Sequence, residues 1–296
     1  MLQEVLSVIT PVFVIALIGY VWIKRDLPFD NNTVSNLVMM IGSPCLIYSS
    51  LTSNTPTFED LFLMVGAASL SIAAALLIAW TVLKILGWPV TTFMPSLVHA
   101  NSGNMGLPLV LLAFGEEGLA LGMAVFFVNS ISQFTIGLSV SSGSFNPAQL
   151  LRQPVIWAVL VVLVVLGLEL QPPRWFNETT KLLGGITIPA MLLMLGTSLA
   201  RLNIASIKQT LTISILRLLL GFSLALIAIE VFGLSGIAAG VILIQFSMPA
   251  AVFNYIFADR FNRDPDKVAA VILQSTLLSI LTLPFLIAYA LSRAGI

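Results

Sequence analysis

The sequence has few charged side chains and no excess of either sign. Only 9% of its 296 residues are Asp, Glu, Lys or Arg, and 13 basic residues balance 13 acidic ones. A chain without net positive charge has no electrostatic means of holding a phosphate backbone, so nucleic acid is not expected as a partner. A hydrophobic share of 58% and a mean hydropathy of +1.04 also exclude an ordinary soluble domain of this size.

Cysteine and histidine are almost absent. Cys45 and His99 are the only residues of their kinds, and one thiol can form neither an intramolecular disulfide nor a zinc site alone. The sequence shows no nucleophile–base spacing, and His99 has no acidic neighbour nearby. We therefore expect no cofactor, no metal and no enzymatic activity.

Long apolar runs fill most of the chain. Runs of about 20 residues are long enough to cross a bilayer as helices. Ten spans are expected, at 5–23, 33–51, 60–86, 92–114, 118–140, 154–171, 177–199, 206–232, 236–258 and 267–291. The first follows "MLQE", which has no basic segment and no cleavage site, so we interpret it as a retained helix and not a signal peptide. The fold class predicted is all-α integral membrane protein.

The basic residues of the loops predict the orientation. With the N-terminus outside, nine lie on the cytoplasmic side, and only Arg174, Lys181 and Arg293 lie outside. The nine are Lys24, Arg25, Lys84, Arg152, Arg201, Lys208, Arg260, Arg263 and Lys267. We predict a multi-pass protein of the cell inner (plasma) membrane, with both termini non-cytoplasmic.

Rare residues coincide when the sequence is shifted by 145 positions. The pairs are Pro28 with Pro173, Asn32 with Asn177, Leu37 with Leu182, Ile41 with Ile186 and Pro44 with Pro189, and after a slippage of four Pro108 meets Pro249. The alternative is coincidence among apolar residues, which the scarcity of proline and asparagine disfavours. Two halves (1–140 and 154–296, joined by the linker 141–153) would hold five spans each. Five is odd, so the repeats would be inverted in the membrane, as in many secondary transporters.

Two expected spans contain residues that interrupt helices. The fourth carries Asn101, Ser102, Gly103, Asn104, Gly106 and Pro108, and the ninth carries Gln245, Ser247, Pro249 and Asn254. Non-helical backbone within a membrane is tolerated only inside protein or beside a watery cavity, and a matched pair of interruptions points to a transporter's central site. We predict that these residues form a substrate site, with the break at Gly103, Gly106, Pro108 and Pro249.

The chemistry of that site follows from the break. Proline suits the first position of a helix, so Pro108 and Pro249 are each expected to open a second half-helix near the midplane. The exposed N–H groups and positive dipole end would attract an anion, and the amides of Asn101, Asn104 and Gln245 suit a carboxylate. The alternative is a pair of proline kinks that only shape packing.

Few other polar groups lie inside the spans. Arg217 is either a partner for an anionic substrate or a cap for the carbonyl end of a broken helix, and His99 is either titratable or merely hydrogen-bonded. Ser43 and Ser49 flank the proline of span 2, and Asn129 and Gln133 share one face of span 5, so these four are further candidates for the substrate pathway. Gln274, Ser275 and Thr276 in span 10 are interpreted as helix-packing groups. Every acidic residue lies in a loop or near a span end, so the sequence offers no midplane carboxylate for a coupling ion.

Four stretches resemble one known family. They are "SPCLIYSSL" in span 2, "NSGNMGLPL" in span 4, "RLLLG" (Arg217 to Gly221) in span 8, and "IQFSMPAAVFNYIFADRFNRDPDKVAAVILQSTLLSILTLP" in spans 9 and 10. Together they are similar to the auxin efflux carrier family, in its bacterial permease branch, which is related to the plant auxin carriers. The resemblance extends over essentially the whole chain, without the long cytoplasmic loop of the plant members.

The resemblance implies an architecture like that of bile-acid symporters and antiporters, in which broken helices 4 and 9 cross. Spans 1, 2, 6 and 7 would form a scaffold that dimerises, and spans 3–5 and 8–10 a transport domain that moves like an elevator. The substrates would be small organic anions, either auxin-like acids or mono- and dicarboxylates. Asn101, Pro108, Gln245 and Pro249 fall on the family's site positions, and Asn129 stands where plant members carry glutamine, which leaves the substrate open.

These observations predict an efflux carrier of small organic anions, driven by the membrane potential or by secondary active transport. A sodium- or proton-coupled organic anion symporter is the first alternative. A membrane channel or receptor is the alternative from another class.

Overall fold

The computed structural model describes residues 2–53, 57–144, 153–168, 170–201 and 207–296, and within these ranges the regular elements are helices. In chain order they are α1 (Leu2–Lys24), α2 (Asn31–Leu37), η1 (Val38–Gly42), α3 (Ser43–Ser53), α4 (Phe58–Leu86), α5 (Val90–Val98), η2 (Ser102–Gly106), α6 (Leu107–Ser132), η3 (Gln133–Gly137), α7 (Leu138–Ser142), α8 (Pro154–Gly167), α9 (Arg174–Gly185), α10 (Thr187–Arg201), α11 (Ile207–Phe232), α12 (Gly236–Phe246), α13 (Phe253–Arg260) and α14 (Pro265–Ala294). The three elements named η are π-helices. Most of the expected linker, and Arg152 with it, lies outside the described residues.

The ends of the longest helices follow from local sequence. Thr57 caps α4 by accepting a hydrogen bond from the amide of Asp60, whose carboxylate accepts one from the Thr57 amide in return. Gly87, with φ of 65°, ends the same helix in the left-handed conformation that glycine adopts without strain. Helix α14 ends in the same way at Gly295.

Seven described segments are long and apolar enough to cross a membrane. They are Gln3–Lys24, Asn31–Thr52, Glu59–Leu86, Ser102–Ser142, Arg174–Arg201, Lys208–Phe232 and Pro265–Ala294. The spans expected at 154–171 and 236–258 correspond to the shorter apolar helices Pro154–Gly167 and Gly236–Phe246. The run Ser102–Ser142 contains non-helical backbone at Gly115, which divides it at the boundary expected between spans 4 and 5. The chain is therefore a multi-pass membrane protein, while the figure of ten crossings stays a prediction.

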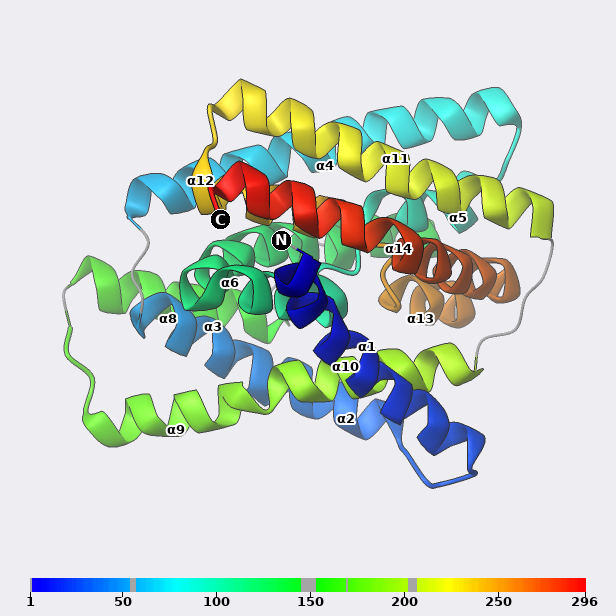
Figure 1. Ribbon diagram of the computed structural model, residues 1–296. Coiled ribbons are helices and arrows are strands. Elements are labelled where there is room, and N and C mark those ends of the chain that lie inside the picture. Colours follow the sequence, from blue (N-terminus) through cyan, green and yellow to red (C-terminus); the bar gives the residue numbers. More distant parts are fainter. Residues whose placement is uncertain (1, 54–56, 145–152, 169, 202–206) are drawn as a thin grey trace.

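The helices form two outer layers with shorter elements between them (Figure 1). Helices α4 and α11 lie along one side, and α9 with α10, α2, α3 and α8 lie along the other. Helix α6 and the shorter helices α5, α12 and α13 lie between these layers. The interrupted helices are therefore at the centre of the molecule.

Helix α1 packs closely on α10 because glycines face backbone at their crossing. A Cβ atom added to Gly196 would lie 1.8 Å from the carbonyl oxygen of Ala16, and one added to Gly19 would lie 2.2 Å from that of Leu193. Small residues that let two backbones approach are characteristic of helix packing in membranes.

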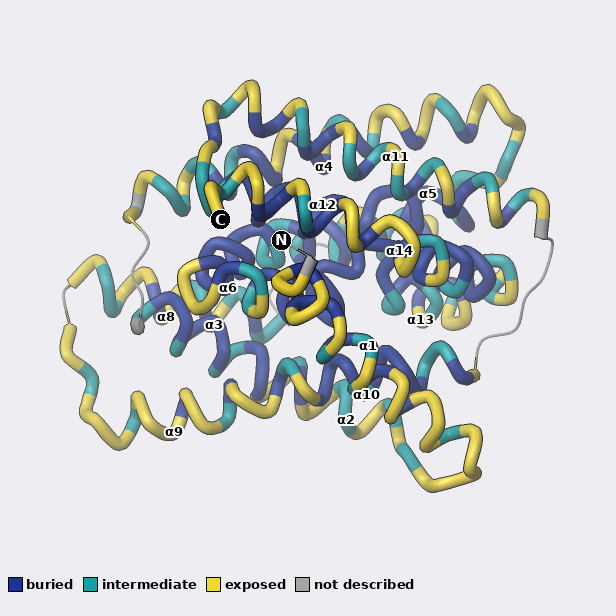
Figure 2. The backbone as a smooth tube through the Cα atoms, viewed as in Figure 1, coloured by how far each residue is buried: buried dark blue, intermediate teal, exposed yellow. Residues whose placement is uncertain are grey.

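Burial separates the centre from the outer faces (Figure 2). The elements between the two layers are mostly buried, whereas the outward faces of α4, α11, α9 and α14 are exposed. Large apolar side chains lie on those faces, among them Ile85 and Phe285, which are 78% and 79% exposed. Such exposure is what a lipid-facing surface requires, since the bilayer solvates it.

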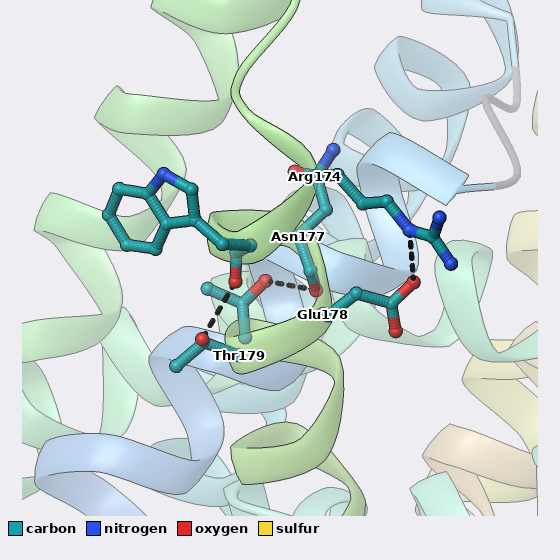
Figure 3. Close-up of polar contacts among 6 residues, drawn as sticks. Arg174, Asn177, Glu178 and Thr179 are labelled. Atoms are coloured by element: carbon teal, nitrogen blue, oxygen red, sulfur yellow. Dashed lines mark hydrogen bonds and ion pairs between the residues drawn. The ribbon is translucent and has the colours of Figure 1, made fainter.

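Helix α9 is the polar exception among the outer helices. Its first turns carry Arg174, whose Nε lies 3.8 Å from Oε1 of Glu178, and Thr179, whose hydroxyl donates to the carbonyl of Trp175 (Figure 3). The span predicted to begin at residue 177 therefore begins with a mainly polar helix, which Ile186 separates from the apolar α10.

Candidate functional site

The first interruption is short. Helix α5 ends at Val98, and His99 and Asn101 have non-helical backbone (φ −89°, ψ 112° and φ −74°, ψ 52°). The chain becomes helical again at Ser102, in the π-helix η2, which continues into α6. The second interruption is longer, because α12 ends at Phe246 and α13 begins only at Phe253.

The two interruptions pair with each other at the centre of the molecule. The Asn101 amide donates to the Pro249 carbonyl over 2.8 Å, and the Ala251 amide donates to the His99 carbonyl over 3.0 Å. The Ala250 amide donates to the hydroxyl of Ser275 on α14 over 3.2 Å. Backbone groups freed by the breaks thus find partners inside the protein, which is the condition for non-helical backbone at membrane depth.

Both interruptions lie where they were expected, and Pro108 stands in the first turn of α6, whereas Pro249 does not open a helix. Pro108 lies within the continuous helix that begins at Ser102, and Pro249 lies four residues before α13. In η2 the amides of Gly106 and Leu107 donate to the carbonyls five residues earlier. The widened turn already departs from α-helical bonding just before Pro108, so the helix accommodates a residue without an amide hydrogen and the break falls at 99–101 instead.

Arg217 on α11 holds the carbonyl ends of both broken helices. Its Nη1 donates to the carbonyls of Leu97 (2.7 Å) and Val98 (2.9 Å) at the end of α5. Its Nη2 donates to the carbonyl of Phe246 (2.6 Å) and its Nε to that of Met248 (3.3 Å) at the end of α12. Of the two roles left open for this residue, these contacts are those of a cap.

The charge of Arg217 is balanced without a carboxylate among these contacts. The side chain is 1% exposed, and each of its four hydrogen bonds goes to a main-chain carbonyl. The carbonyl end of a helix carries about half a negative elementary charge, so two such ends offset one guanidinium. Gly221, one turn along α11, allows this approach, because a Cβ atom there would lie 2.0 Å from the Phe246 carbonyl oxygen.

A narrow cavity lies beside the first interruption and contains about 710 Å³ of unfilled space, part of it open to the outside. Seven of the predicted site residues line it: Ser43, Asn101, Ser102, Gly103, Asn104, Asn129 and Gln133. The other lining residues are Ser35, Val38, Met39, Ala100, Phe126, Ser130, Ile131, Phe134, Gln153, Val155, Ile156, Met191, Met194, Ala251 and Phe253. The described cavity lining therefore contains amides and hydroxyls in an apolar wall, with no charged side chain.

Amide side chains fix the shape of the polar wall. Asn129 Nδ2 donates to the Ala100 carbonyl (3.2 Å) and to the Ser102 hydroxyl (2.9 Å), which holds α6 against the first break. Gln133 Nε2 donates to Asn254 Oδ1 over 2.9 Å, and Asn254 Nδ2 donates to the Pro95 carbonyl over 3.1 Å. Asn254 thus acts behind the cavity, by orienting Gln133.

Asn101 is a lining residue with a buried donor that is unused among the described residues. Its side chain is 3% exposed, and its Nδ2 has no hydrogen-bond partner among the described residues. A buried amide donor without a partner costs about 1–3 kcal/mol, so it is poised to bind an acceptor that enters the cavity.

The remaining predicted residues lie away from this cavity. Gln245 packs between Gly106 and Gly122, where its Nε2 donates weakly to the Gly122 carbonyl (3.5 Å) and its Oε1 has no partner among the described residues. Ser247 lines a separate groove between α11 and α14, and Ser49 lines a surface pocket beside α9. The structure places these three outside the cavity, although Gln245 contacts the predicted break residue Gly106.

His99 is buried behind the polar wall. It is 0% exposed, neither ring nitrogen makes a hydrogen bond of good geometry to a described residue, and the Asn129 side chain lies near the ring. Its Nε2 lies next to Gly137, where a Cβ atom would approach it to 2.9 Å. Within the described residues no group of three or more His, Cys, Asp or Glu side chains could hold a metal ion.

Sequence reasoning missed the apolar half of the cavity. Met191 and Met194 of α10, Val38 and Met39 of η1, and Phe126 of α6 face the polar wall. Methionine and valine within an apolar run look the same whether they face lipid, core or a cavity, so the sequence held no signal for them.

Comparison with known proteins gives one family and two relatives. A family model described as "Membrane transport protein" matches residues 4–148 and 138–287. An uncharacterized transporter of Methanothermobacter thermautotrophicus is 27% identical over 299 aligned residues, which cover 95% of this chain and 96% of the relative. An uncharacterized transporter of Methanocaldococcus jannaschii is 22% identical, with 94% and 96% covered.

Proposed function

The chain belongs to the membrane transport protein family, and from that premise we propose that it is a secondary transporter of small organic anions. The observation that supports an anionic substrate is the polar wall of the cavity at the first interruption. There the unpartnered Nδ2 of Asn101 meets the beginning of the helix that starts at Ser102. The first amides of a helix and its positive dipole end attract negative charge, and amide donors orient a carboxylate.

Electrostatics favour an anion over a cation. No carboxylate lines the described cavity, and the buried guanidinium of Arg217 bonds to the helix ends at both breaks. A substrate cation would enter a low-dielectric site without a counter-charge, which is costly. The apolar wall of Met191, Met194 and Phe126 suits the hydrocarbon part of an organic acid.

For the architecture we propose ten crossings in two inverted repeats. Spans 1, 2, 6 and 7 are the scaffold, and spans 3–5 and 8–10 the transport domain. The cavity supports this division, because η1, α3, α8 and α10 of the scaffold line one side and the two breaks with α6 and η3 line the other. An elevator-like movement of the second group along the first would expose the cavity to each side of the membrane in turn. The proposal includes a scaffold-mediated homodimer in the inner membrane, with both termini non-cytoplasmic and no enzymatic activity.

Counterflow in proteoliposomes tests this function. Vesicles are loaded with unlabelled malonate, malate or indole-3-acetate, and the same acid is added outside in labelled form. A carrier would take up the label in exchange for the unlabelled acid, without an imposed ion gradient. We expect saturable uptake of at least one acid, because a carrier must bind its substrate before it moves. Absence of saturable counterflow with all three acids would reject the proposal, and uptake that rises without saturation would indicate a channel instead.

Asn101→Ala is the variant that tests the site. Loss of a buried charge-assisted donor costs about 1.5–3 kcal/mol, so the apparent affinity for the exchanged acid should fall by about tenfold or more. Ser71→Ala on α4 is the matched control, since Ser71 is 3% exposed, also has an unpartnered hydroxyl, and does not line the cavity. Equal affinity in the Asn101→Ala and Ser71→Ala variants would remove Asn101 from the site.

A further inference from the structure

We propose that His99 binds a proton together with the organic anion, so that the two cross the membrane as one load. This inference rests on the proposed function and names its coupling ion. It starts from the position of the only histidine, at the end of α5, where the first interruption begins.

The imidazole of His99 lacks the partners that a neutral ring requires. A neutral ring has one N–H donor and one acceptor nitrogen, and a side chain that is 0% exposed normally has both satisfied. Neither nitrogen of His99 makes a hydrogen bond of good geometry to a described residue, and the Asn129 side chain is the polar group that lies near enough to interact with the ring. Hydrogen bonds to both nitrogens therefore do not hold the ring in its neutral form.

His99 lies one layer behind the anion cavity. Its carbonyl accepts the Ala251 amide, so the residue is fixed to the crossing of the two breaks. The missing side chain of Gly137 leaves room for Nε2, and Cγ of the cavity-lining Gln133 lies within 4 Å of the same point. Asn129, whose amide bonds to Ala100 on the neighbouring peptide, also lines the cavity. An anion in the cavity would thus be separated from the ring by single amide side chains.

The charges around His99 make proton binding conditional on the anion. The charged residue that faces it is Arg217, which bonds to the carbonyl of Val98 on the preceding residue. The buried side chains of the described residues include no carboxylate, and the neighbours from α6 and η3 are uncharged amides and glycine. A protonated ring would place a second positive charge beside the guanidinium in a low-dielectric core, which is unfavourable until negative charge enters the cavity.

The same argument holds in reverse, because the coupling between two ligands is reciprocal. If the anion raises proton affinity at His99, the proton raises anion affinity in the cavity by the same factor. A monoanion would then cross with one proton and no net charge, whereas a dianion would carry one net negative charge. The transport domain would move the fixed charge of Arg217 in both the loaded and the empty state.

The test uses the whole protein in proteoliposomes with the pH dye pyranine inside and malonate as the probe. Malonate is suitable because its dianion does not diffuse through lipid as a neutral acid. External malonate should acidify the lumen, and an inwardly directed proton gradient should drive its accumulation. Uptake of one proton per anion also predicts an apparent affinity that weakens by up to about tenfold per pH unit as the pH rises.

His99→Gln separates coupling from transport. Glutamine keeps a donor and an acceptor but cannot hold the proton. We therefore expect saturable malonate counterflow to persist in His99→Gln with a weaker apparent affinity, while lumen acidification and the pH dependence of that affinity are lost. Ser96→Ala is the control, because Ser96 on α5 is 0% exposed with an unpartnered hydroxyl, and this variant should keep the wild-type proton movement.

The outcomes are distinguishable. Saturable malonate counterflow in the wild type without lumen acidification would reject the proton site and leave the carrier proposal intact. Proton movement that persists in His99→Gln would reject His99 as the site. Absence of counterflow with malonate, malate and indole-3-acetate in the wild type would reject the carrier proposal itself, and this inference with it.

Discussion

The two interrupted helices share one cap but expose different chemistry. At the first, residues 99–101 are non-helical, and five consecutive residues from Ala100 to Asn104 line the cavity. At the second, residues 247–252 are non-helical, yet only Ala251 and the following Phe253 reach the cavity. The polar groups of the second break are instead used inside the protein, with Pro249 and Ala251 bonded to the first break and Ala250 to Ser275. The comparison teaches that two similar breaks can have different roles. The first break presents ligand-binding groups to the cavity, and the second break holds the first in position.

Removal of the shared cap should have the largest effect, because it acts on both breaks. Arg217→Met leaves four buried carbonyls without their donor, each worth about 1–3 kcal/mol. We expect most of the protein to be lost to aggregation in fluorescence-detected size-exclusion chromatography. Arg217→Lys keeps the charge but loses the planar fork, so it should fold with a lower melting temperature. A Met variant that melts within a few degrees of the wild type would contradict the cap.

Substitution of one glycine beside each break should lower the melting temperature by less than loss of the cap, and by unequal amounts at the two breaks. A Cβ atom at Gly221 would meet the Phe246 backbone oxygen at 2.0 Å, whereas one at Gly103 would meet the movable ring of Phe126 at 2.9 Å. Overpacking of this kind costs about 1–3 kcal/mol, so we expect Gly221→Ala to lower the melting temperature more than Gly103→Ala. Gly103→Ala should instead weaken malonate binding, since Gly103 lines the cavity. The reverse order of melting temperatures would show that the second break is not the rigid one.

The smallest effect is expected at the contact that holds the second break alone. Ser275→Ala removes the acceptor of the Ala250 amide and should cost about 1 kcal/mol of stability, measured by thermal melting. Thr276→Val is the matched control, because the Thr276 hydroxyl donates to the Ile272 carbonyl within the same helix. Malonate affinity should change by less than about threefold in Ser275→Ala, which corresponds to under 1 kcal/mol. A larger change would mean that the second break also shapes the cavity.

Sequence predicted where the helices break better than how they break. Asparagine, glycine and proline in otherwise apolar runs identified both interruptions, because each residue type disfavours a regular helix. The same rules placed Pro108 in the first turn of a helix but did not predict the π-helix η2 before it, because they assume α-helical bonding. Local sequence also could not reveal that Asn254 orients Gln133, because the two are 121 residues apart in the chain.

The site was predictable only on its polar side. A buried amide or arginine in a membrane span demands partners and therefore attracts attention, which is why Asn101, Asn129 and Arg217 were found. For Arg217 the sequence left two roles open, and only the positions of the four carbonyls distinguish them. Gln245 shows the limit of the argument, because the same polar side chain that suits a ligand is packed between Gly106 and Gly122.

Arg217 bonds to the ends of both α5 and α12, and this shared cap makes one half of the chain depend on the other. Under the proposed two-repeat architecture, with a shift of 145 or 141 positions, Arg217 corresponds to Ile72 or Leu76, and neither side chain can donate a hydrogen bond. Residues 1–140 therefore depend on a donor from residues 154–296 to cap the end of α5. A gene split at the linker should still yield a working protein when both pieces are made together, but two copies of the first piece should never assemble.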